Sequence, residues 1–249
     1  MSAVTLRGIT KHFALETRRR RPLYRDLLSA VRGGAAHMVA ALDGIDLEVQ
    51  QGQLLGIVGA NGTGKTTLLR VIAGIYLPSA GTCHVSGRVA CFLEAGVGIA
   101  PTLSVLNNIQ LYGAVVGLTR AETRASTARI LEFAEIEDFR FAPVEHLSVG
   151  MQQRLFFSVM VETMRRRKAD VFLFDECLSG ADARFSEKSE RLLEEVRHPE
   201  QTILYASHNL PHLQRICEAA IWLQHGRVRQ RGQSADILRA YLDRDGAAA

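Results

Sequence analysis

A glycine-rich segment followed by a lysine and a threonine has the clearest chemical content in this sequence. It reads GANGTGKT over residues 59–66 and fits the pattern G-x-x-x-x-G-K-[ST]. Residues 54–58 before it are mainly apolar, as in a buried parallel strand, and the apolar residues after it recur at helical spacing. A glycine-rich turn can contain a lysine by chance, but this pattern between a strand and a helix predicts a phosphate-binding loop.

Each residue type in this loop has a chemical use. Glycines let successive backbone N–H groups turn inward around phosphate oxygens, and the positive end of the following helix points at the same oxygens. Lys65 adds a point charge for the β- and γ-phosphates, and Thr66 offers a hydroxyl to Mg²⁺, which prefers oxygen ligands. We therefore predict a phosphate-binding set that consists of Gly59, Asn61, Gly62, Thr63, Gly64, Lys65, Thr66 and Thr67.

A second apolar strand, residues 169–175, ends in two adjacent carboxylates. In open α/β folds, ligands bind at the carboxyl ends of the strands. Asp175 could therefore hold Mg²⁺ together with Thr66, and Glu176 could orient or deprotonate an attacking water. Two acids after a strand can also simply cap the next helix. The phosphate loop upstream favours the catalytic interpretation.

The order of elements predicts an α/β fold, a P-loop NTPase domain with a mainly parallel core sheet covered on both faces. A block of helical periodicity, approximately residues 95–168, is inserted between strands as a helical subdomain. Two short strands separated by a turn are expected within residues 81–93, and helices near 185–196 and 234–242. Further strands are predicted at residues 54–58, 169–175, 202–206 and 219–224.

The N-terminal part has a different pattern. Residues 4–9 alternate like an edge strand, and residues 42–49 alternate again, which together predict an antiparallel β-subdomain. Between them lies an arginine-rich insertion, approximately residues 14–38, with a predicted short helix at 23–31. We expect the whole chain, residues 1–249, to form one domain.

Composition restricts the class of protein. Hydrophobic residues make up 47% and charged residues 22% of the chain, as in a globular soluble protein. No apolar run approaches the roughly 20 residues of a membrane helix, and the start lacks the apolar core of a secretory signal, so we expect a cytoplasmic location. The net charge is +4, with basic clusters at residues 18–21 and 165–168. Such clusters can contact nucleic acid, lipid headgroups or an acidic partner, but solvated loops are the commoner explanation.

The cysteines are scattered, with no C-x-x-C pair and no histidine at a metal-ligand spacing. This predicts reduced core thiols rather than a disulfide or zinc framework. The cysteines are Cys83, Cys91, Cys177 and Cys217.

A third stretch, LSVGMQQR at residues 147–154, decides between kinds of P-loop protein. Ser148 has N-cap chemistry and Gly150 permits close approach before an apolar-periodic helix, which alone describes an ordinary capped helix. With the phosphate loop, Asp175-Glu176 and His208 after strand 202–206, the stretch resembles the LSGGQ signature of ATP-binding cassette (ABC) proteins.

The resemblance implies further roles. ABC cassettes pair head to tail, so each ATP would lie between the phosphate loop of one chain and Ser148 and Gly150 of the other. Asp182 resembles the D-loop aspartate, and His208 resembles the switch histidine that contacts the γ-phosphate, although a lone histidine there is more often structural. Phe13 falls where the family places an aromatic ring under adenine, and the alternative is a core residue of the edge strand.

The sequence departs from the family pattern at three positions. Val149 and Met151 replace a glycine and the glutamine of the signature. The glutamine of the Q-loop is missing, and Glu94 is the nearest match. A carboxylate can bind Mg²⁺-bound water but cannot donate the hydrogen bonds of an amide. Glu94 is therefore a candidate metal-site residue with Thr66 and Asp175, or else an ordinary loop carboxylate.

These departures resemble one branch of the family. EAGVG at residues 94–98 and DECLSGADARF at 175–185 are similar to the LELGAGF and DEVLAVGDAAF patterns of Wzt-type cassettes, which export O-antigen, teichoic acid or capsule. The resemblance implies an ATPase subunit on the cytoplasmic face of the bacterial inner membrane, bound to an integral-membrane permease whose coupling helix meets residues 95–118. We expect a homodimer, no nucleic acid partner and no C-terminal carbohydrate-binding domain.

Other interpretations remain. The chain could serve an importer or a small-molecule exporter, which the EAGVG and DECLSGADARF patterns disfavour moderately. Soluble cassettes that act on ribosomes or DNA usually carry paired cassettes or long coiled insertions, and neither occurs here. A nonhydrolytic structural cassette is disfavoured by Glu176 and His208, because both are present.

Overall fold

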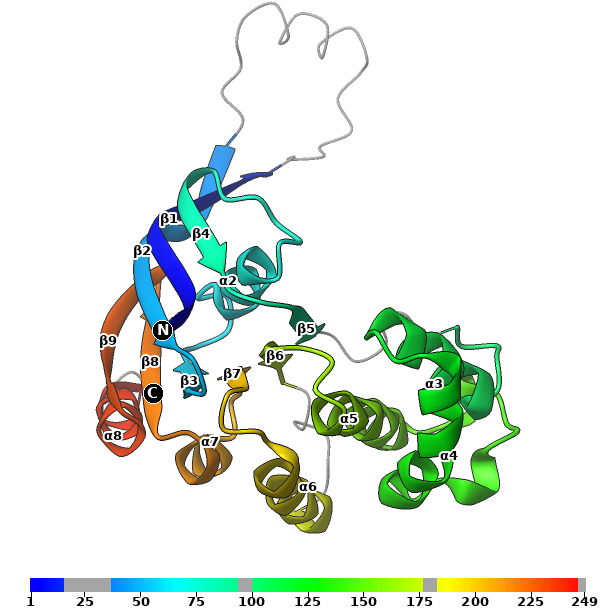
Figure 1. Ribbon diagram of the computed structural model, residues 1–249. Helices are drawn as coiled ribbons and strands as arrows, with labels where there is room; N and C mark the ends of the chain where they lie inside the picture. Colours follow the sequence, from blue (N-terminus) through cyan, green and yellow to red (C-terminus); the bar gives the residue numbers. More distant parts are fainter. Residues whose placement is uncertain (16–36, 94–99, 177–182, 246–249) are drawn as a thin grey trace, which may run out of the picture.

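The computed structural model shows two β-sheets and a group of helices that extends to one side of the larger sheet (Figure 1). The predicted helix at 23–31 lies outside the described part of the chain. The described residues are 1–15, 37–93, 100–176 and 183–245.

Within these ranges, the smaller sheet has three antiparallel strands in the order β2-β1-β4. Their bounds are β1 Ser2–Leu15, β2 His37–Gln50 and β4 Ala80–Val85. The prediction that residues 4–9 form an edge strand is wrong, because β1 lies in the middle: Leu6 pairs with Leu47 on one side and Cys83 on the other. Alternation of apolar and polar residues indicates that one face of a strand is buried. It does not indicate whether the strand pairs with one neighbouring strand or with two.

The larger sheet has six strands in the order β5-β6-β7-β3-β8-β9 within the described residues. Every pairing is parallel except β8 with β9, which form a hairpin. All residues of β3, β6 and β7 are buried, as expected for parallel strands covered on both faces. The strands are β3 Leu54–Val58, β5 Val89–Phe92, β6 Val171–Asp175, β7 Thr202–Ala206, β8 Ala219–Gln224 and β9 Arg227–Gln233.

Helices cover both faces of this sheet. In Figure 1, α2 and the smaller sheet lie above the row of strands, while α6, α7 and α8 lie below it, and α3, α4 and α5 form a group beyond β5 and β6. The short helix α7 was not predicted; the side chain of Asn209 caps it by accepting a hydrogen bond from the His212 N–H. The helices are α2 Lys65–Ile72, α3 Val105–Val115, α4 Arg120–Ala134, α5 Val149–Arg165, α6 Ala183–Val196, α7 Leu210–Ile216 and α8 Ser234–Asp245, with one-turn 3₁₀ segments at Glu137–Phe139 and Val144–His146.

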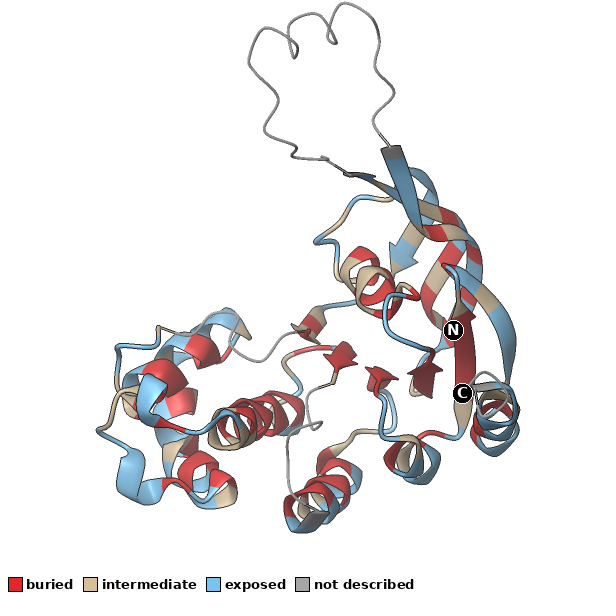
Figure 2. Ribbon diagram, turned by 180° about the vertical axis from the view of Figure 1, so that it is seen from behind, coloured by how far each residue is buried: buried red, intermediate tan, exposed pale blue. Residues whose placement is uncertain are grey.

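The larger sheet separates two hydrophobic cores. Along β6, Val171 and Leu173 face the core shared with α2 and the smaller sheet, whereas Phe172 and Phe174 face the core shared with the other helices. Figure 2 shows buried residues concentrated on these strands and along α5. Among the described residues, no helix combines the length and apolar character that crossing a bilayer requires.

Three of the four cysteines lie in the described part of the chain. Cys83, Cys91 and Cys217 are free thiols, and burial raises the pKa of each. Cys177 lies outside the described residues.

A buried carboxylate joins α4 to α5. The Glu162 side chain accepts hydrogen bonds from Ser126 Oγ at 2.8 Å and from the Arg129 guanidinium at 3.0 and 2.9 Å, with the residue only 3% exposed. Burial acts to raise the pKa of Glu162, but these hydrogen bonds and the charges of Arg129 and Arg165 bring it below its usual value. The helical group is therefore held together by a satisfied ion pair as well as by apolar packing.

We expect Glu162→Gln to lower the free energy of unfolding by about 1–3 kcal/mol near neutral pH, because the Arg129 guanidinium loses its charged hydrogen-bond acceptor. The pKa of Glu162 is depressed in the folded state, so its stabilisation is present above the unfolded-state pKa and is lost as the pH falls through the folded-state pKa. Urea denaturation of both proteins at neutral and acidic pH measures this difference.

The matched control is Glu132→Gln, which changes an exposed carboxylate on α4. It should alter the free energy of unfolding by no more than about 0.5 kcal/mol. Equal effects of the two substitutions would contradict a structural role for the Glu162 ion pair.

Candidate functional site

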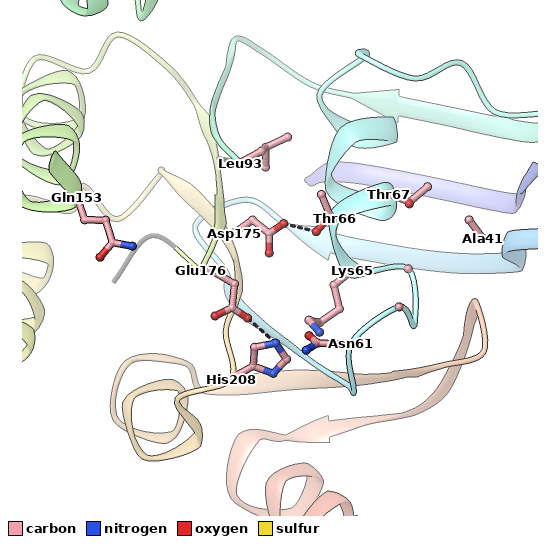
Figure 3. A pocket seen from close by; sticks show the side chains of 12 residues that line it. Ala41, Asn61, Lys65, Thr66, Thr67, Leu93, Gln153, Asp175, Glu176 and His208 are labelled. Carbon is pink, nitrogen blue, oxygen red and sulfur yellow. Dashed lines mark hydrogen bonds and ion pairs between the residues drawn. The ribbon is translucent and has the colours of Figure 1, made fainter. Parts of the chain in front are cut away.

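A cavity of about 400 Å³ lies where β3, β6 and β7 end and α2 begins (Figure 3). Three parallel strands direct their carboxyl ends to one edge of the sheet, so residues that are distant in sequence meet there. The cavity is lined by Ala41, Asn61, Gly62, Gly64, Lys65, Thr66, Thr67, Leu93, Gln153, Asp175, Glu176 and His208.

The loop between β3 and α2 passes against neighbouring backbone. Gly64 has φ +104°, and a Cβ there would lie 2.5 Å from the carbonyl oxygen of Ala41. A Cβ on Gly59 would lie 2.3 Å from the carbonyl oxygen of Leu223. Glycine is therefore required at both positions by close approach of the backbone, as well as by the conformation at Gly64.

Lys65 is buried, with 7% of the residue exposed. Its ammonium donates hydrogen bonds to the carbonyl oxygens of Gly59 at 2.7 Å and Ala60 at 3.1 Å. Burial lowers the pKa of Lys65, and the negative charges of Glu176 and Asp175 act in the opposite direction. The loop thus holds a cation at the wall of the cavity, close to two carboxylates.

Thr66 and Asp175 are joined directly, since the Thr66 hydroxyl donates a hydrogen bond to Asp175 Oδ2. Burial raises the pKa of Asp175, while the Thr66 hydrogen bond and the charge of Lys65 lower it. A hydroxyl and a carboxylate side by side are hard oxygen donors, and they fit Mg²⁺, which keeps several waters and takes few protein ligands. The described residues contain no cluster of three or more His, Cys, Asp or Glu side chains placed to hold a metal.

Glu176 and His208 form the other polar pair. Glu176 Oε1 lies 3.0 Å from His208 Nε2, and the Glu176 N–H donates to the carbonyl oxygen of Ala206 at 2.9 Å. Glu176 has φ +53°, a conformation that is uncommon for residues other than glycine and concentrates at functional sites. Burial raises the pKa of Glu176, and the charge of His208 lowers it. A raised pKa makes the ionised carboxylate a stronger base toward a proton of water.

The structure brings most of the predicted site residues to this cavity. Gly59 and Thr63 belong to the loop without lining the cavity; Thr63 Oγ1 donates to the Ala60 carbonyl at 2.9 Å. Glu94 and Asp182 lie outside the described residues. The predicted residues that line the cavity are Asn61, Gly62, Gly64, Lys65, Thr66, Thr67, Asp175, Glu176 and His208.

Three predicted residues lie elsewhere. Ser148 is exposed and caps α5 by accepting a hydrogen bond from the Met151 N–H at 3.2 Å, and Gly150 follows in the first turn. Phe13 is partly buried and packs edge-on against Tyr76, with ring centroids 5.4 Å apart. None of them lines the described cavity, so their roles in nucleotide binding stay predictions.

Sequence reasoning missed three lining residues, namely Ala41, Leu93 and Gln153. Ala41 and Leu93 carry no local signal, because a small residue in β2 and an apolar residue after β5 look like any other strand positions. Gln153 had a usable signal: it occupies a polar position on the apolar face of α5, four residues before the buried Phe157.

A family model described as ABC transporter matches residues 42–179, more than half of the chain. The chain belongs to the ABC transporter family. The expectation of an ATP-binding cassette is therefore confirmed. Since members of this family bind ATP, ATP is the ligand of the phosphate-binding loop.

Curated relatives come from several bacteria. The chain is 34% identical to the O-antigen export system ATP-binding protein RfbB of Myxococcus xanthus over 98% of its length, and to the teichoic acids export ATP-binding protein TagH of Bacillus cereus over 96%. It spans only 56% and 42% of those two proteins. The O-antigen export system ATP-binding protein RfbB of Klebsiella pneumoniae is also 34% identical, over 81% of this chain and 80% of the relative.

Solved structures show the same fold at lower identity. An ATP-binding cassette in a dimeric, post-hydrolysis state bound to ADP and Pi superposes with a TM-score of 0.74 at 20% identity, covering 93% of this chain and 98% of the other. An ATP-binding subunit of an ABC transporter gives a TM-score of 0.73 over 96% of this chain and 93% of the other. The predicted α/β cassette fold is confirmed.

Proposed function

We propose that this chain is the ATP-hydrolysing subunit of an exporter that moves a lipid-linked surface polysaccharide across the bacterial inner membrane. One observation supports ATP hydrolysis most directly. Lys65, the Thr66–Asp175 pair and the Glu176–His208 pair all line the same cavity. The export part is supported by relatives whose names refer to O-antigen and teichoic acids.

In this proposal each pair has its own task. Lys65 and the loop N–H groups bind the phosphates of ATP, and Thr66 and Asp175 hold Mg²⁺, which would neutralise phosphate charge. The oxygen of a water bonds to the γ-phosphorus while the bond from that phosphorus to the bridging oxygen breaks. Glu176 accepts one proton of the water, ADP leaves with the bridging oxygen, and His208 stabilises the charge on the transferred group.

We further propose that a second copy completes the site. Ser148 and Gly150 lie at the exposed start of α5, where the N-terminal N–H groups of the helix can meet phosphate oxygens bound to another chain. Asp182, Phe13 under adenine and Glu94 beside the metal complete the proposed set. In this arrangement one chain holds half of each catalytic site.

The proposed membrane partner is an integral permease, with this chain bound peripherally at the cytoplasmic face. The helical block, approximately residues 95–168, and especially residues 95–118, would receive the permease. The domain organisation proposed is one cassette over residues 1–249, with the arginine-rich insertion at approximately 14–38.

The experiment that tests this function is copurification of the tagged chain from gently solubilised membranes, followed by identification of its partner and measurement of ATP turnover. A polytopic membrane partner and ATP-dependent phosphate release would support the proposal. A chain that stays alone or associates with ribosomes would contradict export, and a complex without turnover would contradict ATP hydrolysis.

The pKa of Glu176 predicts a pH dependence of turnover. A general base must be ionised, and burial raises the pKa of Glu176 above its usual value of 4.5. Turnover should therefore be lost as the pH falls through this raised pKa, so that the acidic limb of the kcat profile lies above pH 4.5. Steady-state phosphate release at saturating ATP measures the profile, with circular dichroism at each pH to exclude unfolding. An acidic limb at or below the ordinary glutamate range would contradict the assignment.

A further inference from the structure

We propose that Glu190 on α6 is a positioning residue for hydrolysis, which anchors α7 and thereby holds His208 beside Glu176. This inference rests on the proposed ATP hydrolysis and adds to it a residue outside the cavity. In the chain, α6 comes after β6 and Glu176, whereas α7 comes after β7 and His208. A contact between these two helices can therefore fix the two catalytic side chains relative to each other.

His208 depends on its surroundings for its position. Its side chain is 45% exposed, and its Nε2 lies 3.0 Å from Glu176 Oε1 (Figure 3). The backbone N–H of His208 also donates a hydrogen bond to the Glu176 carboxylate, which lowers the pKa of Glu176. Because a ring contact and a backbone contact both join these two residues, a shift of the backbone at His208 would disturb both contacts together.

The backbone around His208 is tied to the first turn of α7 through Asn209. The Asn209 N–H donates to Ser207 Oγ at 3.1 Å, on the other side of His208. The Asn209 side-chain oxygen accepts from the His212 N–H at 3.1 Å and so caps the helix. His208 thus lies between two residues that are joined to each other and to α7, and the placement of the first turn of α7 sets its position.

Glu190 holds this turn from the side of α6. Both Glu190 and His212 are buried, and Glu190 Oε1 lies 2.6 Å from His212 Nδ1. The same carboxylate accepts two hydrogen bonds from Arg215, at 2.8 Å from Nε and 2.6 Å from Nη2. His212 and Arg215 are three residues apart and share one face of α7. The ring of His212 also packs against Tyr205 of β7, with ring centroids 5.3 Å apart.

The charges of this network are balanced. Burial acts to raise the pKa of Glu190, but hydrogen bonds from Arg215 and His212 bring it below its usual value. Burial lowers the pKa of His212, and Glu190 acts in the opposite direction. An ionised carboxylate can only accept, so a neutral His212 donates its Nδ1–H while Arg215 supplies the positive charge. Both donors on α7 therefore depend on one buried acceptor.

Apolar packing holds α7 on the sheet independently of Glu190. Leu213 is fully buried, and its Cδ2 would lie 3.0 Å from a Cβ on Gly56 of β3. Loss of Glu190 should therefore leave α7 on the sheet while its first turn, next to His208, gains freedom to shift. A displacement of less than 1 Å in a catalytic group is enough to slow a reaction, because the reacting geometry is narrow.

The first variant is Glu190→Gln, which keeps the shape of the side chain but turns an NH₂ group toward one of its donors. In the full chain, in the complex in which it turns over ATP, we expect kcat to fall about tenfold, with KM for ATP changed less than about twofold. Circular dichroism fixes a temperature at which both proteins are folded. The control is Glu187→Gln, an exposed carboxylate on α6 whose charge also raises the pKa of Arg215. It should leave kcat within about twofold of the unmodified chain.

Two variants of His212 separate positioning from packing. His212→Leu removes the donor and keeps an apolar side chain, so kcat should fall about tenfold. His212→Asn places its Nδ2 where Nδ1 of the ring lies and can still donate to Glu190, so kcat should stay within about threefold of the unmodified chain. A side chain that only fills the core would give the opposite order, because a buried leucine packs better than a buried asparagine.

The outcomes distinguish failure of this inference from failure of the proposed function. If the unmodified complex turns over ATP and Glu190→Gln has a kcat within twofold of it, or falls no further than Glu187→Gln, Glu190 does not position the site. A kcat of His212→Asn no higher than that of His212→Leu would also overturn the inference. No turnover by the unmodified complex above that of Glu176→Gln would overturn the proposed function and this inference with it.

Discussion

Glu176→Gln is expected to reduce ATP turnover at least about a hundredfold, the scale of removing a general base, while ATP binding is kept. The amide has the same shape as the carboxylate and can still contact His208 Nε2, which lies 3.0 Å from Glu176 Oε1. It cannot accept the proton of the attacking water at any working pH. The backbone at this position, with φ +53°, is preserved by the substitution.

Phosphate release at saturating ATP measures the loss, and titration with a fluorescent ATP analogue measures binding in the same protein. Glu194→Gln is the matched control, since it changes an exposed carboxylate on α6 and should leave both quantities unchanged. If Glu176→Gln turned over ATP at a rate within tenfold of the unmodified chain, Glu176 would not be the general base.

Lys65→Met should weaken ATP binding on the order of a hundredfold, as expected for loss of a charge-assisted hydrogen bond to phosphate. Methionine retains the apolar stem of the buried side chain but not its ammonium. The substitution also removes the cation whose charge lowers the pKa of Asp175 and Glu176, so both pKa values should rise further. Turnover should consequently fall at saturating ATP as well.

Isothermal titration with ATP and Mg²⁺ gives the dissociation constant directly. Lys168→Met is the control, because Lys168 pairs with Glu122 at 2.8 Å in the helical group and is not among the residues that line the cavity. It should bind ATP as the unmodified chain does. Binding by Lys65→Met within about threefold of the unmodified chain would exclude Lys65 as a phosphate ligand.

Local patterns predicted most of the fold. The strands at 202–206 and 219–224 have the bounds of β7 and β8, and the block of helical periodicity at approximately residues 95–168 contains α3, α4 and α5. Periodicity succeeds here because each element repeats one buried face along its own length. The same reasoning failed for β1, whose second neighbour, β4, comes from a distant part of the chain.

Motif spacing predicted much of the site for a related reason. A phosphate loop and an acidic pair each follow a buried parallel strand, and parallel strands of one sheet end at a common edge. The sequence therefore predicted that Lys65, Asp175 and Glu176 lie close together, because this proximity requires only that the strands before them run parallel in one sheet.

The sequence by itself determined the phosphate loop, the apolar strands and helices around it, and the chemical types that surround a bound phosphate. Only the tertiary structure decided the strand order, the contact of Thr66 with Asp175, the packing of Phe13 on Tyr76, and the entry of Ala41, Leu93 and Gln153 into the cavity. The physical reason is that a helix or strand is specified by its own residues, whereas the side chain that faces a cavity depends on how one element is placed and rotated against another.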